Sequence, residues 1–240
     1  MTGALQSIIF DFDGVIADSE PLHFRAFQHT LAQEGIELRS AEYYARYLGY
    51  DDVGLFQALA TDRGLPMDAS RMSALLAAKG QRLQEMLERG HVLFPGAADF
   101  VRSAAAEVPI AIASGALRRE IVEITNAAGI GNLFAVIVAA GDTPESKPSP
   151  APYLLAFEQL QLHTGNDMDP RRTVAIEDSQ WGLESARGAG LRCVGVTNSY
   201  DSSRLPGAEL VATGLDALTL PALHHLCATD PQPIAGAPHA

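Results

Sequence analysis

Four short apolar runs of this sequence are each followed by residues that could bind a cation or act on a phosphate ester. Carboxylates follow the first and fourth runs, a hydroxyl follows the second, and an ammonium lies in the loop after the third. Phosphoryl transfer requires this combination, because it depends on charge neutralisation and positioning. In chain order, the candidates are Asp11 and Asp13, Ser114 and Gly115, Lys147, and Glu177 and Asp178.

Asp11 is the candidate nucleophile. A phosphate monoester is a dianion that hydrolyses extremely slowly unaided, and a carboxylate that attacks phosphorus divides the reaction into two easier steps through an aspartyl phosphate. The two anions repel each other unless a cation screens them, and Mg2+ held by a few carboxylates supplies that charge. We expect Asp11, Asp178 and the main-chain oxygen of Asp13 to be the metal ligands, with Glu177 orienting the metal's water molecules.

The remaining candidates have separate expected roles. Clustered carboxylates raise one another's pKa, so Asp13 could donate a proton to the leaving group and later accept one from the attacking water. Lys147 would neutralise phosphate charge. Ser114 and Gly115, with the amides that open a helix near Leu117, would bind phosphate oxygens. Taken singly, each has an ordinary structural explanation, such as a turn or a helix cap; their joint occurrence in this order points to chemistry.

These candidates must be positioned by the elements that precede them. Runs rich in Val and Ile alternate with amphipathic stretches, which predicts an α/β fold with a doubly wound parallel sheet. In such sheets, ligands bind beyond the carboxyl ends of the strands. The expected strands are Ser7–Phe12, Pro109–Ala113, Ala135–Ala139, Thr173–Glu177 and Cys193–Thr197. The expected helices between them are Ala97–Ala106, Arg118–Ala128, Pro152–Leu162 and Gln180–Gly188.

The interval between the first two strands, residues 18–93, contains no convincing strand. Ser19 and Pro21 suit the start of a helix that Gly35 could end. An apolar stripe indicates another helix, which Gly90 could end. The stripe consists of Met72, Leu75, Leu76, Leu83, Met86 and Leu87. Because the interval is too long for a loop in a compact domain, it is predicted to be a separate helical domain.

The predicted domain organisation follows from this insert. Residues 1–17 and 94–226 form the catalytic core, and residues 18–93 form a helical cap. Residues 227–240, rich in Ala, Pro, Gly and His, are predicted to be a disordered tail.

The set of motifs resembles that of the haloacid dehalogenase-like hydrolases. The four matching motifs are Phe10–Ser19, Ser114-Gly115, Lys147–Pro150, and Ile176–Ser179 with Gly182. The resemblance runs from about Leu5 to Leu218. It implies a Rossmann-like core, a mobile helical cap, Mg2+ dependence and an aspartyl-phosphate intermediate, and the position of the insert is typical of the helical-cap subgroup. Asp13 argues against the true dehalogenases and the phosphonate-cleaving branch, both of which lack this aspartate.

Within this family, the motifs are most similar to those of β-phosphoglucomutase and of small sugar-phosphate phosphatases. His23 matches a histidine that the mutases carry in the cap linker. The mutases also present a basic pair around a glycine of the cap. Leu48 and Asp52 occupy those positions here, and Arg46 is the nearby cation. The sequence therefore favours a phosphatase of a small phosphorylated metabolite, such as a sugar phosphate, with a sugar phosphomutase as the alternative. His23 itself remains open between a role in substrate binding and one in packing.

Composition restricts the possible partners and location. A net charge of −12 argues against a nucleic-acid partner. No apolar run approaches the roughly 20 residues of a membrane helix, and no basic region precedes the first apolar run as in a secretion signal. We therefore expect a cytoplasmic protein; the sequence leaves the oligomeric state open, with a monomer favoured. Cys193 and Cys227 lack metal or redox spacing, and His224-His225 is too isolated to indicate a metal site.

Two other function classes fit less well. A non-enzymatic receiver-like phosphoacceptor also places acidic residues, a hydroxyl and a lysine at strand ends, but it is shorter and has no helical insert. A nucleotide-binding oxidoreductase needs a glycine-rich loop after the first strand, where this sequence is acidic.

Overall fold

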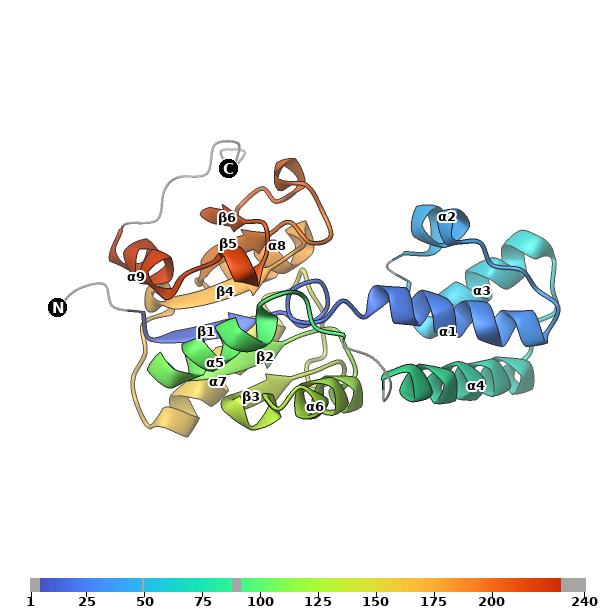
Figure 1. Ribbon diagram of the computed structural model, residues 1–240, viewed down its shortest axis with the longest axis horizontal. Helices are drawn as coiled ribbons and strands as arrows, with labels where there is room; N and C mark the ends of the chain where they lie inside the picture. Colours follow the sequence, from blue (N-terminus) through green and yellow to red (C-terminus); the bar gives the residue numbers. More distant parts are fainter. Residues whose placement is uncertain (1–4, 49, 88–91, 230–240) are drawn as a thin grey trace. The chain divides into compact units, whose positions relative to one another are not determined.

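The computed structural model describes residues 5–48, 50–87 and 92–229. The chain divides into a core unit, residues 1–18 with 92–240, and a cap unit, residues 19–91 (Figure 1). The expected helical insert, residues 18–93, contains the cap unit. Among the described residues, no helix is both long and apolar enough to cross a membrane.

The core unit is built on a six-stranded parallel sheet, as the alternating pattern predicted. The strand order is β3-β2-β1-β4-β5-β6, so the first strand lies at the centre and the chain reverses direction across the sheet beside it. The strands are β1 (Ser7–Phe10), β2 (Ile110–Ala113), β3 (Phe134–Val138), β4 (Thr173–Glu177), β5 (Arg192–Val196) and β6 (Leu210–Ala212). β1, β2, β4 and β5 are buried along their whole length, because helices cover both faces of the sheet.

Alternate residues of β1 face different helices. Ile9 belongs to the apolar cluster formed with α7 and α8, and α7 packs on β1, β2 and β3. Phe10 points to the other face, where its ring meets that of Phe100 on α5 edge to face at 6.2 Å. The core helices are α5 (Ala97–Glu107), α6 (Arg118–Ala127), α7 (Ala151–Thr164), α8 (Gln180–Gly188) and α9 (Leu220–Ala228).

β1 is shorter than expected, because its chain leaves the sheet after Phe10 rather than after Phe12. Asp11 still donates its N–H to Ile176 at 2.9 Å, and a tight turn follows in which Ile16 and Ala17 donate theirs to Phe12. Ala17 then forms an antiparallel bridge with Leu93. The two crossings between the units are thus hydrogen-bonded to each other within the core unit.

Among its described residues, the regular elements of the cap unit are all helices. Its elements are α1 (Glu20–Gln33), α2 (Ser40–Glu42) with a π-helical turn (Tyr43–Tyr47), α3 (Asp52–Arg63) and α4 (Ala69–Leu87). Pro21 lies in the first turn of α1, and Gly35 follows the helix with φ of +72°, as its sequence position predicted. Gly90 lies outside the described residues. The predicted stripe of α4 buries Leu75, Leu83 and Leu87.

The prediction for the tail is wrong at its start. Cys227 and Ala228 belong to α9 rather than to a disordered segment, because α9 buries an apolar face that includes Leu223, Leu226 and Cys227. Residues 230–240 lie outside the described residues. The sequence also gave no indication of β6, which has only three residues at the edge of the sheet.

Candidate active site

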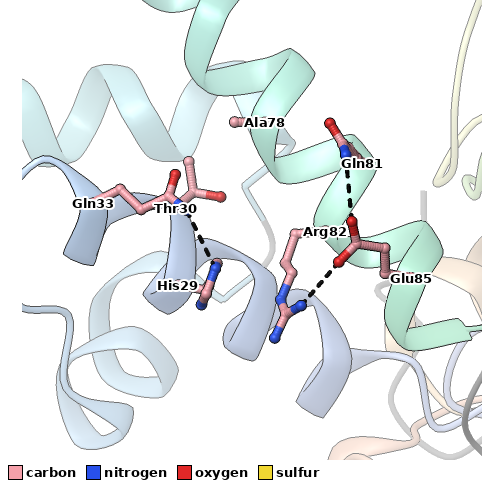
Figure 2. Close-up of a pocket in the computed structure, with 7 residues that line it drawn as sticks. All are labelled: His29, Thr30, Gln33, Ala78, Gln81, Arg82 and Glu85. Atoms are coloured by element: carbon pink, nitrogen blue, oxygen red, sulfur yellow. Dashed lines mark hydrogen bonds and ion pairs between the residues drawn. The ribbon is translucent and has the colours of Figure 1, made fainter.

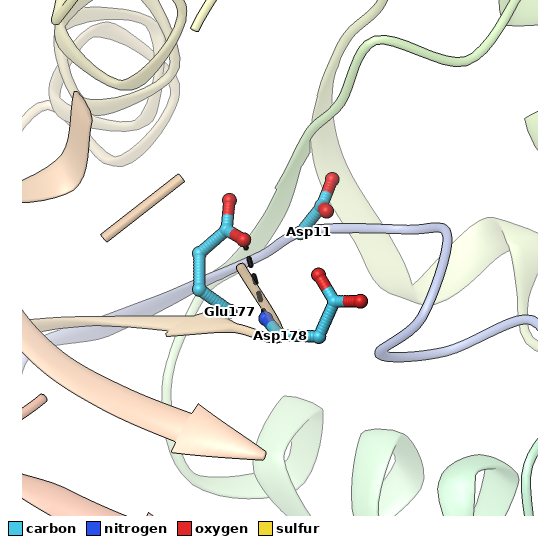
Figure 3. A group of neighbouring side chains, drawn as sticks. All are labelled: Asp11, Glu177 and Asp178. Carbon is cyan, nitrogen blue, oxygen red and sulfur yellow. Dashed lines mark hydrogen bonds between the residues drawn. The ribbon is translucent and has the colours of Figure 1, made fainter. Parts of the chain in front are cut away.

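Three carboxylates meet at the carboxyl edge of the two central strands. Asp11 follows β1, Glu177 ends β4 and Asp178 comes next; β1 and β4 pair with Phe10 opposite Ile176. One oxygen from each carboxylate lies within 4.8 Å of the others (Figure 3). An all-carboxylate oxygen set of this size matches the ligand preference of Mg2+. The residues present therefore fit the metal that the sequence led us to expect.

Lys147 lies against two of these carboxylates. Its Nζ is 2.9 Å from Asp11 Oδ1 and 2.6 Å from Glu177 Oε1. The loop after β3 thus delivers its ammonium to the strand ends, as expected. Burial by itself would lower the pKa of Lys147, but the adjacent charges of Asp11 and Glu177 outweigh that effect and raise it above its usual value. Lys147 is therefore a permanent cation.

The acidic residues carry more negative charge than Lys147 balances. Burial, followed by repulsion from Asp11 and Glu177, raises the pKa of Asp178 to about 7, although a hydrogen bond from Ser199 opposes this rise. Burial and repulsion from Asp11 also raise the pKa of Glu177. Proximity of like charges in a buried place has this effect. A divalent cation at this position would relieve the excess.

Glu177 is enclosed by hydrogen-bond donors. Its side chain is fully buried, with Oε1 accepting from Lys147 and, at 2.8 Å, from the Tyr153 hydroxyl. Oε2 accepts from the Asp178 N–H at 3.2 Å and the Ser179 hydroxyl at 3.3 Å. A Cβ on Gly182, in the first turn of α8, would overlap the Glu177 carboxylate, so only glycine fits at this position. The buried carboxylate thus has a compartment shaped for it.

Asp13 and Gly14 lie in the turn that follows Asp11. Asp13 is half-buried and forms a bridge with Ala17. Gly14 has φ of +78°, and a Cβ there would overlap the carboxylate of Asp178. Asn198 donates to the carbonyl of Gly14 at 2.8 Å. The close approach of this turn to Asp178 therefore requires glycine.

Ser114 and Gly115 follow β2, the neighbour of β1, at the same edge of the sheet. Ser114 is buried, its N–H bonds to Val138 at 3.0 Å and its hydroxyl accepts from the N–H of Ala116 at 3.1 Å. α6 begins at Arg118 after Leu117 at the N-cap position, and no side chain among the described residues caps it. Amides at this helix start are therefore not used by a capping side chain, as an anion-binding terminus requires.

His23 lies in the cap unit, on α1, and its Nδ1 is 2.9 Å from Lys79 Nζ. Lys79 is 1% exposed and forms an ion pair with Asp52 at 2.7 Å. Burial, with a smaller effect from the Lys79 charge, lowers the pKa of His23 to about 4. His23 is therefore neutral near pH 7 and accepts a hydrogen bond from Lys79. Asp52 stands where the mutases carry a basic residue, and here it neutralises the buried Lys79.

Sequence reasoning missed several of these contacts. Lys79 lies between Leu75 and Leu83 at helical spacing, and a lysine on an apolar stripe was a readable sign of a buried cation. Tyr153 resembled any aromatic residue of an amphipathic helix. Nothing in the sequence indicated Asn198 or Ser199, which reach the site from the loop after β5.

A separate polar cavity of about 140 Å³ lies between α1 and α4 of the cap unit (Figure 2). It contains none of the candidate residues, and within it Arg82 is paired with Glu85 at 2.9 Å. The lining residues are His29, Thr30, Gln33, Ala78, Gln81, Arg82 and Glu85. This cavity lacks the grouped carboxylates of the strand ends and is not a second acidic site.

Comparison with known families supports the resemblance noted in the sequence. Residues 8–196 match the profile of the haloacid dehalogenase-like hydrolases. The chain is 35% identical to protein CbbY of Rhodobacter capsulatus over 206 residues, which cover 82% of this chain and 87% of that protein. It is 30% identical over 227 residues to a phosphorylated carbohydrates phosphatase of Thermotoga maritima, covering 90% and 95% of the two chains.

Solved structures give the same result. CbbY from Rhodobacter sphaeroides in complex with phosphate superposes with a TM-score of 0.74 at 29% identity, covering 88% of this chain and 95% of the other. A variant of that CbbY is known with xylulose 1,5-bisphosphate bound. A β-phosphoglucomutase from Clostridium difficile shares the fold, with a TM-score of 0.74 at 20% identity, covering 93% of this chain and 97% of the other.

Proposed function

We propose that this chain, which belongs to the haloacid dehalogenase-like hydrolase family, is a Mg2+-dependent phosphatase of a small phosphorylated metabolite. The observation that carries the proposal is the cluster of Asp11, Glu177 and Asp178 with Lys147 against it. Such a site suits an anionic ester, because its cations can neutralise the substrate while a carboxylate attacks.

Asp11, Asp178 and the main-chain oxygen of Asp13 would hold Mg2+, with Glu177 behind them. When bound, the ion supplies the positive charge that lets a carboxylate and a phosphate approach. Asp178 with a pKa near 7 is partly protonated at neutral pH without metal, so metal binding should release a proton there.

The chain's own residues then divide the reaction into two steps. Asp11 attacks phosphorus, the bond to the leaving oxygen breaks, and Asp13 gives that oxygen a proton. Water next attacks the aspartyl phosphate, and Asp13 accepts its proton, so that inorganic phosphate leaves and Asp11 is restored. Lys147 neutralises charge on the phosphoryl oxygens, and Ser114 and Gly115, with the first amides of α6, bind them.

Sugar phosphates are the proposed substrate class. Two relatives support this choice: one is named as a phosphatase of phosphorylated carbohydrates, and a variant of another is known with xylulose 1,5-bisphosphate. A phosphomutase is the second candidate, favoured by His23. It is disfavoured by Asp52, which pairs with Lys79 inside the cap and offers no positive charge to a second phosphate.

The decisive experiment is a phosphate-release assay. Purified protein with Mg2+ and a panel of sugar monophosphates and bisphosphates should release inorganic phosphate, and Asp11→Asn should not. Conversion of β-glucose 1-phosphate to the 6-phosphate, with a bisphosphate primer and little phosphate release, would instead identify a mutase. An intact protein that released phosphate from no member of the panel would contradict the proposal.

A further inference from the structure

We infer that Tyr153 is a positioning residue for Lys147: its hydroxyl fixes Glu177 and its ring lies beside the ammonium, so that the ammonium faces Asp11. The inference rests on the proposed function, in which Lys147 neutralises phosphate charge, and adds a residue that no sequence motif indicated. Among the hydrogen bonds of the described residues, none joins Tyr153 to the nucleophile; Tyr153 acts through Glu177 and Lys147.

Hydrogen bonds to both oxygens hold the Glu177 carboxylate in place. Tyr153 is fully buried near the start of α7, and its hydroxyl donates to Glu177 Oε1 at 2.8 Å. Lys147 Nζ donates to the same oxygen at 2.6 Å. The other oxygen is occupied by Asp178 N–H and the Ser179 hydroxyl. With both oxygens held from inside the protein, the carboxylate has one orientation.

The ring of Tyr153 lies beside the Lys147 ammonium. Lys147 Nζ lies 5.0 Å from the ring centroid, which is within cation–π range. The ammonium is thereby enclosed by Asp11, Glu177 and an aromatic face. A lysine has a flexible four-carbon stem and is a compact point charge, so its direction has to be imposed by neighbours of this kind.

The hydroxyl also affects the balance between the two carboxylates that share Lys147. A neutral donor on Glu177 Oε1 takes up part of that oxygen's negative charge, so Glu177 competes less strongly for the ammonium. Removing the hydroxyl leaves Lys147 as the sole side-chain donor on that oxygen among the contacts described. The ammonium should then move toward Glu177 and away from Asp11, where phosphate charge would develop.

A comparison within the chain separates positioning from ordinary packing. Tyr47 is 1% exposed and its hydroxyl donates to Asp62 at 2.8 Å, so it resembles Tyr153 in being a buried tyrosine bonded to a carboxylate, although the Asp62 side chain is 31% exposed. Asp62, however, pairs with Arg46 in the cap unit rather than with any candidate residue. Tyr47→Phe therefore costs the same kind of bond without touching the lysine.

The test uses Tyr153→Phe, with Tyr47→Phe as the control, in the full chain with Mg2+ and the best substrate from the phosphosugar panel. Phenylalanine keeps the ring and removes the hydroxyl alone. We expect kcat to fall about 10-fold in Tyr153→Phe, as for loss of one charge-assisted bond that orients a reacting group, with KM changed less than 3-fold. In Tyr47→Phe both should stay near wild type. Equal kcat in the two variants would overturn the inference.

A crystal structure of metal-free Tyr153→Phe gives a readout that does not depend on activity. We expect the distance from Lys147 Nζ to Asp11 Oδ1 to exceed 4 Å; an unchanged distance would overturn the inference, even if no substrate were found. Should Tyr153→Phe fail to fold, Glu177→Gln provides the second variant. Because glutamine removes the charge that competes with Asp11 for the ammonium, the distance from Lys147 Nζ to Asp11 Oδ1 should not lengthen in this variant; a lysine more than 4 Å from Asp11 would overturn positioning through Glu177. Failure of the proposed function would show separately, as a wild-type protein that releases no phosphate.

Discussion

Lys147 Nζ lies 2.9 Å from Asp11 Oδ1, although the loop after β3 and the end of β1 supply these two residues from strands that are not neighbours in the sheet. The same ammonium also forms an ion pair with Glu177, and Asp178 is the third carboxylate of the cluster. The buried cluster therefore holds three carboxylates and one lysine, which contacts two of them. This excess of negative charge makes the site sensitive both to the loss of a carboxylate and to an added cation.

Asp11→Asn should remove activity while leaving the fold intact. Loss of the nucleophile should lower kcat on the order of 10³-fold or more. The melting temperature in EDTA should stay equal or rise, because one repelling charge is gone. Phosphate release and thermal unfolding measure the two effects. Asp167→Asn, which changes an exposed acid of the same unit, is the control and should match wild type. Full activity in Asp11→Asn would refute the nucleophile assignment.

Mg2+ should both activate and stabilise the protein. Chelation with EDTA should abolish phosphate release, and saturating Mg2+ should raise the melting temperature. A ligand at 100 times its Kd adds about 2.7 kcal/mol to the free energy of unfolding. Asp178→Asn removes one of the proposed ligands and should reduce this increase. An equal increase in wild type and Asp178→Asn would place the metal elsewhere.

The residues at strand ends could be predicted because a buried parallel strand is readable as a short Val- and Ile-rich run. Asp11, Glu177 and Asp178 lie where those runs stop, and the topology of a parallel sheet brings such positions to one edge. Lys147 was harder to predict, because it lies in a loop. It could be identified only together with the three strand-end carboxylates.

The residues that support the site could not be predicted in the same way. Tyr153 acts through a hydroxyl on an otherwise apolar helix face, and that hydroxyl meets Glu177 at the end of β4 only because of how α7 packs on the sheet. In the cap unit, the place of Lys79 between Leu75 and Leu83 was readable, but its partners were not, because His23 and Asp52 come from two other cap helices. Residues 227–228 looked like tail from composition, but their neighbours on α9 bury an apolar face.

Gly14→Ala should inactivate the protein because the added Cβ would clash with Asp178, in addition to straining the backbone. Gly14 combines a φ of +78° with a position where a Cβ would overlap Asp178. Gly35 has a nearly equal φ of +72° but nothing within 4 Å of its Cβ position. Gly35→Ala should therefore cost only about 1–2 kcal/mol of stability through strain, with kcat unchanged. Gly14→Ala should lose both more stability and most of its activity. Urea unfolding and phosphate release measure these effects, and similar behaviour of the two variants would contradict the clash.

Stability should fall between about pH 6.5 and pH 4 because of His23. Its pKa is lowered to about 4 in the folded protein, so the unfolded chain takes up a proton at this residue first as the pH falls. Stability is thus present above the unfolded value of 6.5 and is lost as the pH falls through the folded value. The loss should be on the order of 1–3 kcal/mol.

Acidic side chains also titrate in this range. The quantity to measure is therefore the difference between wild type and variant in how much stability is lost as the pH falls. Urea unfolding of wild type and His23→Gln at pH 7 and pH 4.5 should show a smaller loss in the variant, because glutamine cannot take up the proton. His163→Gln, which changes an exposed histidine on α7, should behave like wild type. A loss in His23→Gln as large as in wild type would mean that His23 is not held neutral beside Lys79.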